Sequence, residues 1–310
     1  MNILMLGTGG IGGYLAARLI PAGYSVSLLA RGAHLAAIRR NGLTLVEDGA
    51  DTVVHPAAAS DDLAALPPAD LAVFAVKGQD LPAMIDLYRP YARADTLVLP
   101  FQNGVDAPDL LAGAFGADNT LIGVARIFSN ITAPGVVTQY GGANSFTIGD
   151  HRGGQSSPRV RAVIEAFREA GIKVPECGDV TVDLWRKFLL FNAVSGSTAA
   201  ARCRFREIRQ NPELLAFSRG LVEEVDAVGR ARGVDLPPDA VDETMRLWAR
   251  LPDDARSSTA HDLELGKPIE VDRICGAVAR MGRELGIATP NSAAVAALLA
   301  PWRNGSRPDG

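Results

Sequence analysis

Leu6-Gly7-Thr8-Gly9-Gly10-Ile11-Gly12 connects two segments with different hydrophobic patterns. In residues 2–6, Asn2 is followed by the apolar run Ile3-Leu4-Met5-Leu6, which is typical of a buried parallel strand, and residues 14–20 have the apolar spacing of a helix. The segment Ser25-Val26-Ser27-Leu28-Leu29 supplies the second strand of a βαβ unit. The glycine-rich stretch therefore lies at a strand-to-helix turn of the kind that binds dinucleotides, and it predicts an α/β fold.

Each glycine of this turn has a separate role. Gly7 allows the tight connection between strand and helix, Gly9 lets the backbone approach a pyrophosphate, and Gly12 lets the helix pack on the strand. The N–H groups of the helix N-terminus then face the phosphates. The pattern predicts that Gly7, Gly9 and Gly12 bind a cofactor, with a glycine-rich turn that has no ligand as the alternative interpretation.

The residue that follows the second strand indicates which dinucleotide is bound. An acidic residue there accepts a hydrogen bond from the ribose of NAD, whereas an arginine accommodates the 2′-phosphate of NADP. The chain has Arg31 at this point and no acid beside it. We therefore expect NADP (NADPH) as the cofactor, although a solvated surface arginine would give the same sequence.

The length and the change of pattern along the chain predict two domains. A chain of 310 residues is longer than one hydrophobic core usually supports. Residues 1–178 alternate apolar runs with helical patterns, which predicts a Rossmann-type, doubly wound parallel sheet that binds the cofactor. Residues 179–310 contain long helical patterns without convincing strands, which predicts a second, all-helical C-terminal domain for substrate binding and catalysis.

Individual elements follow from the same patterns. Further strands are expected at residues 70–76, 96–100, 121–125 and 172–175, a hairpin at residues 136–140 and 145–149, and a helix at residues 158–170. In the second domain, helices are expected at residues 181–201, 212–232, 238–250 and 268–285.

Composition excludes several classes of function. The net charge is −4 and the basic residues are scattered, so neither nucleic acid nor an anionic membrane is expected as a partner. The three cysteines, Cys177, Cys203 and Cys275, are far apart, so we expect no disulfide framework and no metal site but three buried thiols. Without a signal peptide or an apolar run of about 20 residues, the expected compartment is the cytoplasm.

Polar residues that follow predicted strands are candidates for the site, because ligands of such sheets bind at the carboxyl ends of the strands. Lys77 follows the strand at residues 70–76, and Asn103 follows the strand at residues 96–100. A loop lysine and an ordinary Asn-Gly turn are the alternative interpretations.

The helical domain adds further candidates. Lys187 is followed by four apolar residues, so its ammonium either extends to the surface or faces a cleft, where partial burial would make it a better proton donor. Ser258 and Asp262 share one face of a short helix, and Glu270 comes shortly after it. For these three residues, a helix cap and surface charges are the alternatives.

Taken together, these elements resemble the ketopantoate reductase family over nearly the whole chain. The residues that carry the resemblance are the glycine pattern, Arg31, Lys77, Gln102-Asn103-Gly104, Trp185-x-Lys187, and Ser257-Ser258 with Asp262 and Glu270. The resemblance implies NADPH-dependent reduction of a 2-oxo acid, ketopantoate to pantoate on the route to pantothenate and coenzyme A.

The resemblance also implies roles for single residues. Lys187 matches the proton donor and Glu270 the glutamate near that lysine and the nicotinamide ribose. Ser258 matches the serine at the substrate, with Asp262 beside it on the same helix face. Asn103 lines the crevice and is expected to contact cofactor and substrate, and Lys77 is expected to contact the cofactor.

One position departs from the family pattern, which has asparagines four and eight residues after the catalytic lysine. This chain has Phe191 and Ser195 there, and Asn192 points away from the Lys187 face. Ser195 is expected to bind the substrate directly or through water. Two alternatives remain: a reductase for a more apolar 2-oxo acid, and an NADP-binding sensor without turnover. A homodimer is compatible with the apolar helical domain.

Overall fold

The computed structural model describes residues 1–153 and 156–306. The chain forms two compact units, of which the first consists of Met1–Gln102 and Ala107–Thr181. The second consists of Asn103–Asp106 and the chain from Val182 onward. The predicted domains, 1–178 and 179–310, differ from these units mainly in the placement of Asn103–Asp106; residues 307–310 lie outside the described chain.

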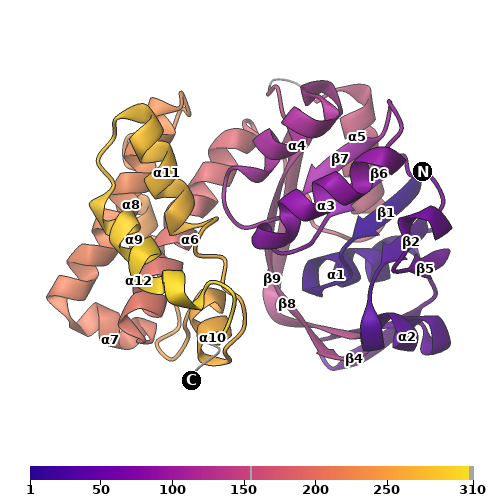
Figure 1. Ribbon diagram of the computed structural model, residues 1–310, viewed down its shortest axis with the longest axis horizontal. Coiled ribbons are helices and arrows are strands. Elements are labelled where there is room, and N and C mark those ends of the chain that lie inside the picture. The colour runs from indigo at the N-terminus through magenta and orange to yellow at the C-terminus, as the bar shows by residue number, and fades with distance from the viewer. Residues whose placement is uncertain (154–155, 307–310) are drawn as a thin grey trace. The chain divides into compact units, whose positions relative to one another are not determined.

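A five-stranded parallel sheet forms the centre of the first unit, with the strand order β5-β2-β1-β6-β7 (Figure 1). The strands are β1 (Asn2–Leu6), β2 (Ser25–Leu29), β5 (Ala58–Ser60), β6 (Leu71–Phe74) and β7 (Leu97–Pro100). From β1 the chain proceeds outward on one side to β2 and β5, and then crosses to β6 and β7 on the other side. The doubly wound topology is thereby confirmed, and its switch point lies between β1 and β6.

Helices cover both faces of this sheet. They are α1 (Gly10–Leu19), α2 (Gly32–Asn41), α3 (Leu81–Tyr88), α4 (Ala107–Phe115) and α5 (Pro158–Glu169). On β1, Ile3 and Met5 pack in one core with α1 and α5, whereas Leu4 and Leu6 pack in another with α3 and α4. This burial on both faces explains why residues 3–6 form an apolar run rather than an alternating pattern.

A second sheet in the first unit has the order β4-β3-β9-β8. Its strands are β3 (Leu43–Glu47), β4 (Ala50–Val54), β8 (Leu121–Ala133) and β9 (Val136–Asp150). The predicted strand at residues 121–125 is the beginning of β8 and thus lies in this second sheet. Thr120 connects the two sheets through an isolated parallel bridge to Val98.

The predicted hairpin at residues 136–140 and 145–149 is wrong, because both segments lie on β9, which pairs antiparallel with β8. The turn of the hairpin is at Gly135, whose φ of 78° is favourable for glycine. Between the pairs Arg126–Ser145 and Phe128–Tyr140, β8 advances by two residues and β9 by five. The glycine pair inside β9 therefore belongs to a bulge.

The predicted strand at residues 172–175 is also wrong. This segment is irregular, and Lys173 contributes one backbone hydrogen bond, from Phe146 N to Lys173 O, of 2.9 Å. Pro175 has no N–H group to continue a ladder, which explains why the apolar spacing does not lead to a strand here.

The second unit is helical in its described part (Figure 1). Its helices are α6 (Val180–Ala201), α7 (Phe205–Gln210), α8 (Pro212–Ala231), α9 (Ala240–Ala249), α10 (Ser258–Glu264), α11 (Cys275–Leu285) and α12 (Pro290–Leu299). The predictions for residues 181–201, 212–232 and 238–250 are confirmed. The helix expected at 268–285 begins only at Cys275, because Ile274 has a non-helical backbone conformation (φ −105°, ψ −98°).

The three cysteines differ in their environment. Cys275 is buried, and its burial raises the pKa of the thiol, whereas Cys203 is half-buried and Cys177 is exposed. The expectation that all three are buried is therefore wrong for Cys177, which lies in the loop between α5 and α6.

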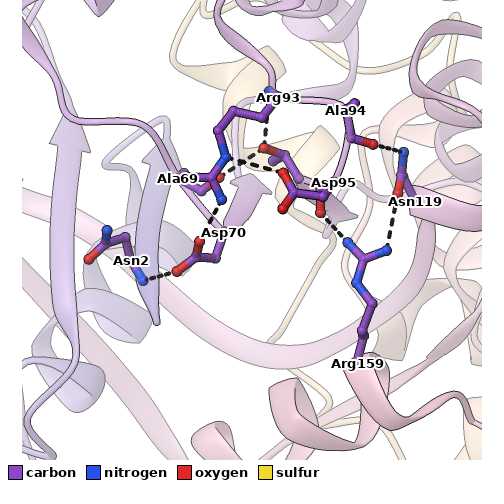
Figure 2. Close-up of polar contacts among 9 residues, drawn as sticks. Asn2, Ala69, Asp70, Arg93, Ala94, Asp95, Asn119 and Arg159 are labelled. Atoms are coloured by element: carbon purple, nitrogen blue, oxygen red, sulfur yellow. Dashed lines mark hydrogen bonds and ion pairs between the residues drawn. The ribbon is translucent and has the colours of Figure 1, made fainter.

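A polar network stabilises the amino-terminal ends of the strands (Figure 2). The carboxylate of Asp70, just before β6, accepts hydrogen bonds from Asn2 N and Arg93 Nη2, both at 2.7 Å. These two donors lower the pKa of Asp70, the Asn2 N–H having the larger effect. Arg93 also contacts Asp95 at 3.2 Å. The network lies at the amino-terminal ends of the strands, whereas the glycine turn lies at their carboxyl ends. We therefore assign these contacts a role in stability rather than in ligand binding.

Candidate active site

The glycine turn has the geometry that cofactor binding requires. Gly7 has a φ of 101°, and a Cβ atom there would lie 2.8 Å from Val76 Cγ1. A Cβ atom at Gly12 would lie 2.1 Å from Gly7 O, so α1 packs too closely for any side chain. By contrast, a Cβ atom at Gly9 would have no neighbour within 4 Å. Gly7 and Gly12 are thus needed for packing, whereas Gly9 leaves open space.

The beginning of α1 fits an anionic group. Gly9 caps the helix without a side-chain hydrogen bond, and the first turn contains no acidic residue. The first N–H groups of a helix have no partner within the helix and favour negative charge. Thr8 is buried, and its hydroxyl donates to Leu29 O at 3.1 Å, which attaches the turn to the end of β2.

Three further residues lie at the carboxyl ends of strands. Arg31 is exposed and is the N-cap residue of α2, directly after β2. Lys77 is exposed after β6, next to Val76, which lies against Gly7. Gln102 is buried after β7, and its Nε2 donates to Phe74 O and Val76 O, both at 2.9 Å.

In the second unit, three predicted site residues form one hydrogen-bonded group. Lys187 Nζ donates to Asn103 Oδ1 at 3.1 Å, and Asn103 Nδ2 donates to Glu270 Oε2 at 3.3 Å. They come from α6, from the segment Asn103–Asp106, and from the turn before α11. Because the carboxylate of Glu270 can only accept, the NH₂ group of the Asn103 amide must point toward Glu270. The oxygen of the same amide then points toward the ammonium of Lys187.

The apolar residues after Lys187 lie in two environments: some are buried in the core, and one lies beside the Lys187 ammonium. Phe188 and Leu189 are buried in the helical unit, whereas Lys187 itself is half-buried. Its Nζ lies 5.6 Å from the ring centroid of Phe191, which is a cation–π distance. The ammonium is thus held between an amide oxygen and an aromatic face.

The polar residues further along α6 are buried. Asn192 Nδ2 donates to Leu221 O on α8 at 3.3 Å, which confirms that Asn192 is directed away from the Lys187 face. Ser195 is 2% exposed, and its hydroxyl has no hydrogen-bond partner among the described residues. Such a buried hydroxyl is available to a polar group or a water that reaches it.

Helix α10 places the remaining predicted residues. Ser257, rather than Ser258, is the N-cap, and its Oγ accepts from Ala260 N at 3.1 Å. Ser258 is exposed in the first turn, and Asp262 is half-buried one turn later. The hydrogen bonds that join Lys187, Asn103 and Glu270 do not include Ser195 or Ser258.

The ion pairs beside this group are not predicted from the sequence. Asp106 accepts from Arg273 at 3.0 Å and from Arg280 at 2.9 Å. The only signal in the sequence is an acid three residues after Asn103, and its basic partners are more than a hundred residues away.

Two family models match most of this chain. Residues 3–153 match the model described as ketopantoate reductase PanE/ApbA, and residues 179–302 match the model of the C-terminal region of the same family. The chain belongs to the ketopantoate reductase family. The predicted family is therefore confirmed.

Individual relatives agree with this assignment. A 2-dehydropantoate 2-reductase of Mesorhizobium japonicum is 33% identical over an alignment of 328 residues. The alignment covers 96% of this chain and 97% of that protein. The crystal structure of a PanE/ApbA family ketopantoate reductase from Ralstonia eutropha has a TM-score of 0.88 at 30% identity and covers 98% of both chains. D-Mandelate dehydrogenase with NADH and anilino(oxo)acetate has a TM-score of 0.86 at 20% identity over 98% of both chains, which shows the fold alone.

Family membership establishes the enzyme class. The protein is an oxidoreductase that acts on a CH–OH group of a small molecule, in a nicotinamide-dependent family. In residues 1–153 and 156–306, no helix has both the length and the apolarity to cross a bilayer. Within the same residues, no three His, Cys, Asp or Glu side chains are grouped as metal ligands would be.

Proposed function

We propose that this oxidoreductase reduces 2-dehydropantoate (ketopantoate) to pantoate with NADPH, and that Lys187 is the proton donor. The observation that carries the proposal is the hydrogen-bonded group of Lys187, Asn103 and Glu270 in a chain of this family. When bound, the nicotinamide supplies the hydride. The residues of the chain then have to bind the 2-oxo acid and protonate its carbonyl oxygen.

Lys187 is suited to the proton transfer. Its ammonium carries the proton at Nζ and stabilises negative charge as it develops on the substrate oxygen. Asn103 holds that ammonium in one position, and Glu270 holds the amide of Asn103. Ser195, Ser258 and Asp262 are proposed to bind the polar groups of the substrate.

The glycine turn and Arg31 are proposed to bind the cofactor, with Lys77, Asn103 and Glu270 contributing. The open space at Gly9 and the absence of an acid in the first turn of α1 support a bound pyrophosphate. The exposed guanidinium of Arg31 after β2 supports a 2′-phosphate, hence NADPH. An Arg31→Ala variant should lose about 10-fold or more in kcat/KM for NADPH and little for NADH. Arg40→Ala, at the exposed end of α2, is the matched control.

The substrate is tested by steady-state oxidation of NADPH with a pair of 2-oxo acids. Ketopantoate and trimethylpyruvate differ only in the 4-hydroxyl group. A site that hydrogen-bonds this hydroxyl discriminates by orders of magnitude, because the analogue leaves its polar groups unpaired. Strong preference for ketopantoate supports the proposal. Turnover of neither acid, with intact NADPH binding, would contradict it and favour a sensor that binds NADP without catalysis.

A second candidate function is reduction of a more apolar 2-oxo acid. The observation that favours it is Phe191, whose ring lies 5.6 Å from Lys187 Nζ and gives an apolar surface one turn from the proton donor. Equal or better turnover of trimethylpyruvate would support this candidate. In that case, Phe191→Asn should shift the substrate preference toward ketopantoate. The control is Phe128→Asn, because Phe128 is an exposed aromatic residue on β8; this variant should leave the substrate preference unchanged.

A further inference from the structure

The segment Asn103–Asp106 has an unusual place in the fold. The residues before and after it belong to the first unit, but these four residues belong to the helical unit. The segment carries Asn103, the residue between Lys187 and Glu270. Whatever fixes the segment on the helical unit therefore also fixes the amide that holds the ammonium.

Two arginines converge on the other end of this segment. Asp106 Oδ2 accepts from Arg273 Nη1 at 3.0 Å and from Arg280 Nη2 at 2.9 Å. The side chain of Asp106 is 16% exposed and that of Arg273 is 20% exposed, so water screens this pair less than a surface pair. Arg280 is more exposed, at 41%. The ion pair with Arg273 is thus expected to contribute more than that with Arg280.

The backbone of the segment is in close contact with the same turn. Gly104 has a φ of 104°, and a Cβ atom there would lie 2.8 Å from Arg273 O. Arg273 is in turn fixed relative to Glu270, because Arg273 N donates to Glu270 O at 3.0 Å. Asn103 and Asp106 are therefore attached to one turn of the helical unit, which supplies both Glu270 and Arg273.

We propose that Asp106, with Arg273 and Arg280, is a positioning residue that holds the Asn103 amide between Lys187 and Glu270. This inference rests on the proposed role of Lys187 as the proton donor. Asp106 does not touch the ammonium; it acts through the backbone of the segment. Loss of its charge leaves the two arginines facing a neutral partner, which weakens both contacts and lets Asn103 move away from Lys187 Nζ.

The first test measures the position of Asn103 without turnover. Lys187 is acylated with acetic anhydride, and its labelling rate relative to that of exposed Lys267 is measured by mass spectrometry in the Asp106→Asn variant. Loss of the Asn103 hydrogen bond should raise this ratio by about 2–10-fold. The control is Asp242→Asn, which removes a surface ion pair with Arg219 (2.7 Å) in the same unit. An unchanged ratio in Asp106→Asn would overturn the proposal.

The second test separates positioning from general stability. Asp106→Asn should lower kcat by about 10-fold or more with little change in KM, because a displaced donor affects the transition state more than binding. Arg273→Lys should lower kcat more than Arg280→Lys does. Equal kcat in wild type and Asp106→Asn would overturn the proposal.

The two tests distinguish this proposal from the proposed function. A wild-type enzyme without turnover of any 2-oxo acid would refute the function, while the labelling ratio of Lys187 still decides whether Asp106 positions Asn103.

Discussion

The glycine turn allows a sharp prediction, because neighbouring glycines differ in what a methyl group would meet. In Gly9→Ala, the new Cβ atom has no protein neighbour within 4 Å, and the backbone at Gly9 (φ −83°) is accessible to alanine. We expect the free energy of unfolding to be unchanged or higher by about 0.4–1 kcal/mol, because alanine restricts the unfolded chain. The methyl group would fill the space proposed for the pyrophosphate, so NADPH affinity should fall about 10-fold or more.

Gly10→Ala is the matched variant one residue later. Its Cβ atom would lie 2.0 Å from Ser129 O on β8, which is backbone and has to move. We expect a loss of about 1–3 kcal/mol or more in unfolding free energy, as for overpacked cores. Denaturant unfolding and titration of the quenching of protein fluorescence by NADPH measure the two quantities. A Gly9→Ala variant with wild-type affinity for NADPH would refute the assignment of this turn to the cofactor.

Three further predictions concern residues in both units. Asn103→Ala should lower kcat about 10-fold or more, because Lys187 loses a hydrogen bond of a charged group; a wild-type kcat would contradict this role. Glu224→Gln should lower the free energy of unfolding by about 1.5–3 kcal/mol, because the buried carboxylate accepts hydrogen bonds from two backbone N–H groups at the start of α12, at 2.6 and 2.8 Å. An unchanged midpoint of denaturant unfolding would contradict this prediction. Asp70→Asn should lower the melting temperature at neutral pH. Because folding lowers the pKa of Asp70, its contribution is complete above the ordinary value of 3.8 and is lost as pH falls through the folded pKa, so the variants should converge in strong acid.

The parallel sheet was predictable because its signals are local. The run at residues 3–6 is apolar on both faces, and the glycine turn follows it directly. The spacing of α6, α8 and α9 likewise follows from local patterns. By contrast, the bulge of β9 depends on its pairing with β8, and the glycine pair within it resembles a turn when the partner strand is unknown.

The candidate site was only partly predictable for a similar reason. Lys187, Asn103 and Glu270 were singled out one by one from sequence and resemblance, and the structure joins them by hydrogen bonds. The grouping of Asn103–Asp106 with the helical unit could not be predicted, because it depends on contacts with Arg273 and Arg280 that are distant in sequence.

We propose that Lys187 protonates the carbonyl oxygen of the substrate as the hydride arrives. The most direct test is single-turnover oxidation of bound NADPH by ketopantoate in wild type and in Lys187→Met, which keeps the apolar stem and removes the ammonium. In Lys187→Met we expect a single-turnover rate lower by about 10²–10⁴-fold with unchanged NADPH affinity. A single-turnover rate of Lys187→Met close to that of the wild type would contradict it.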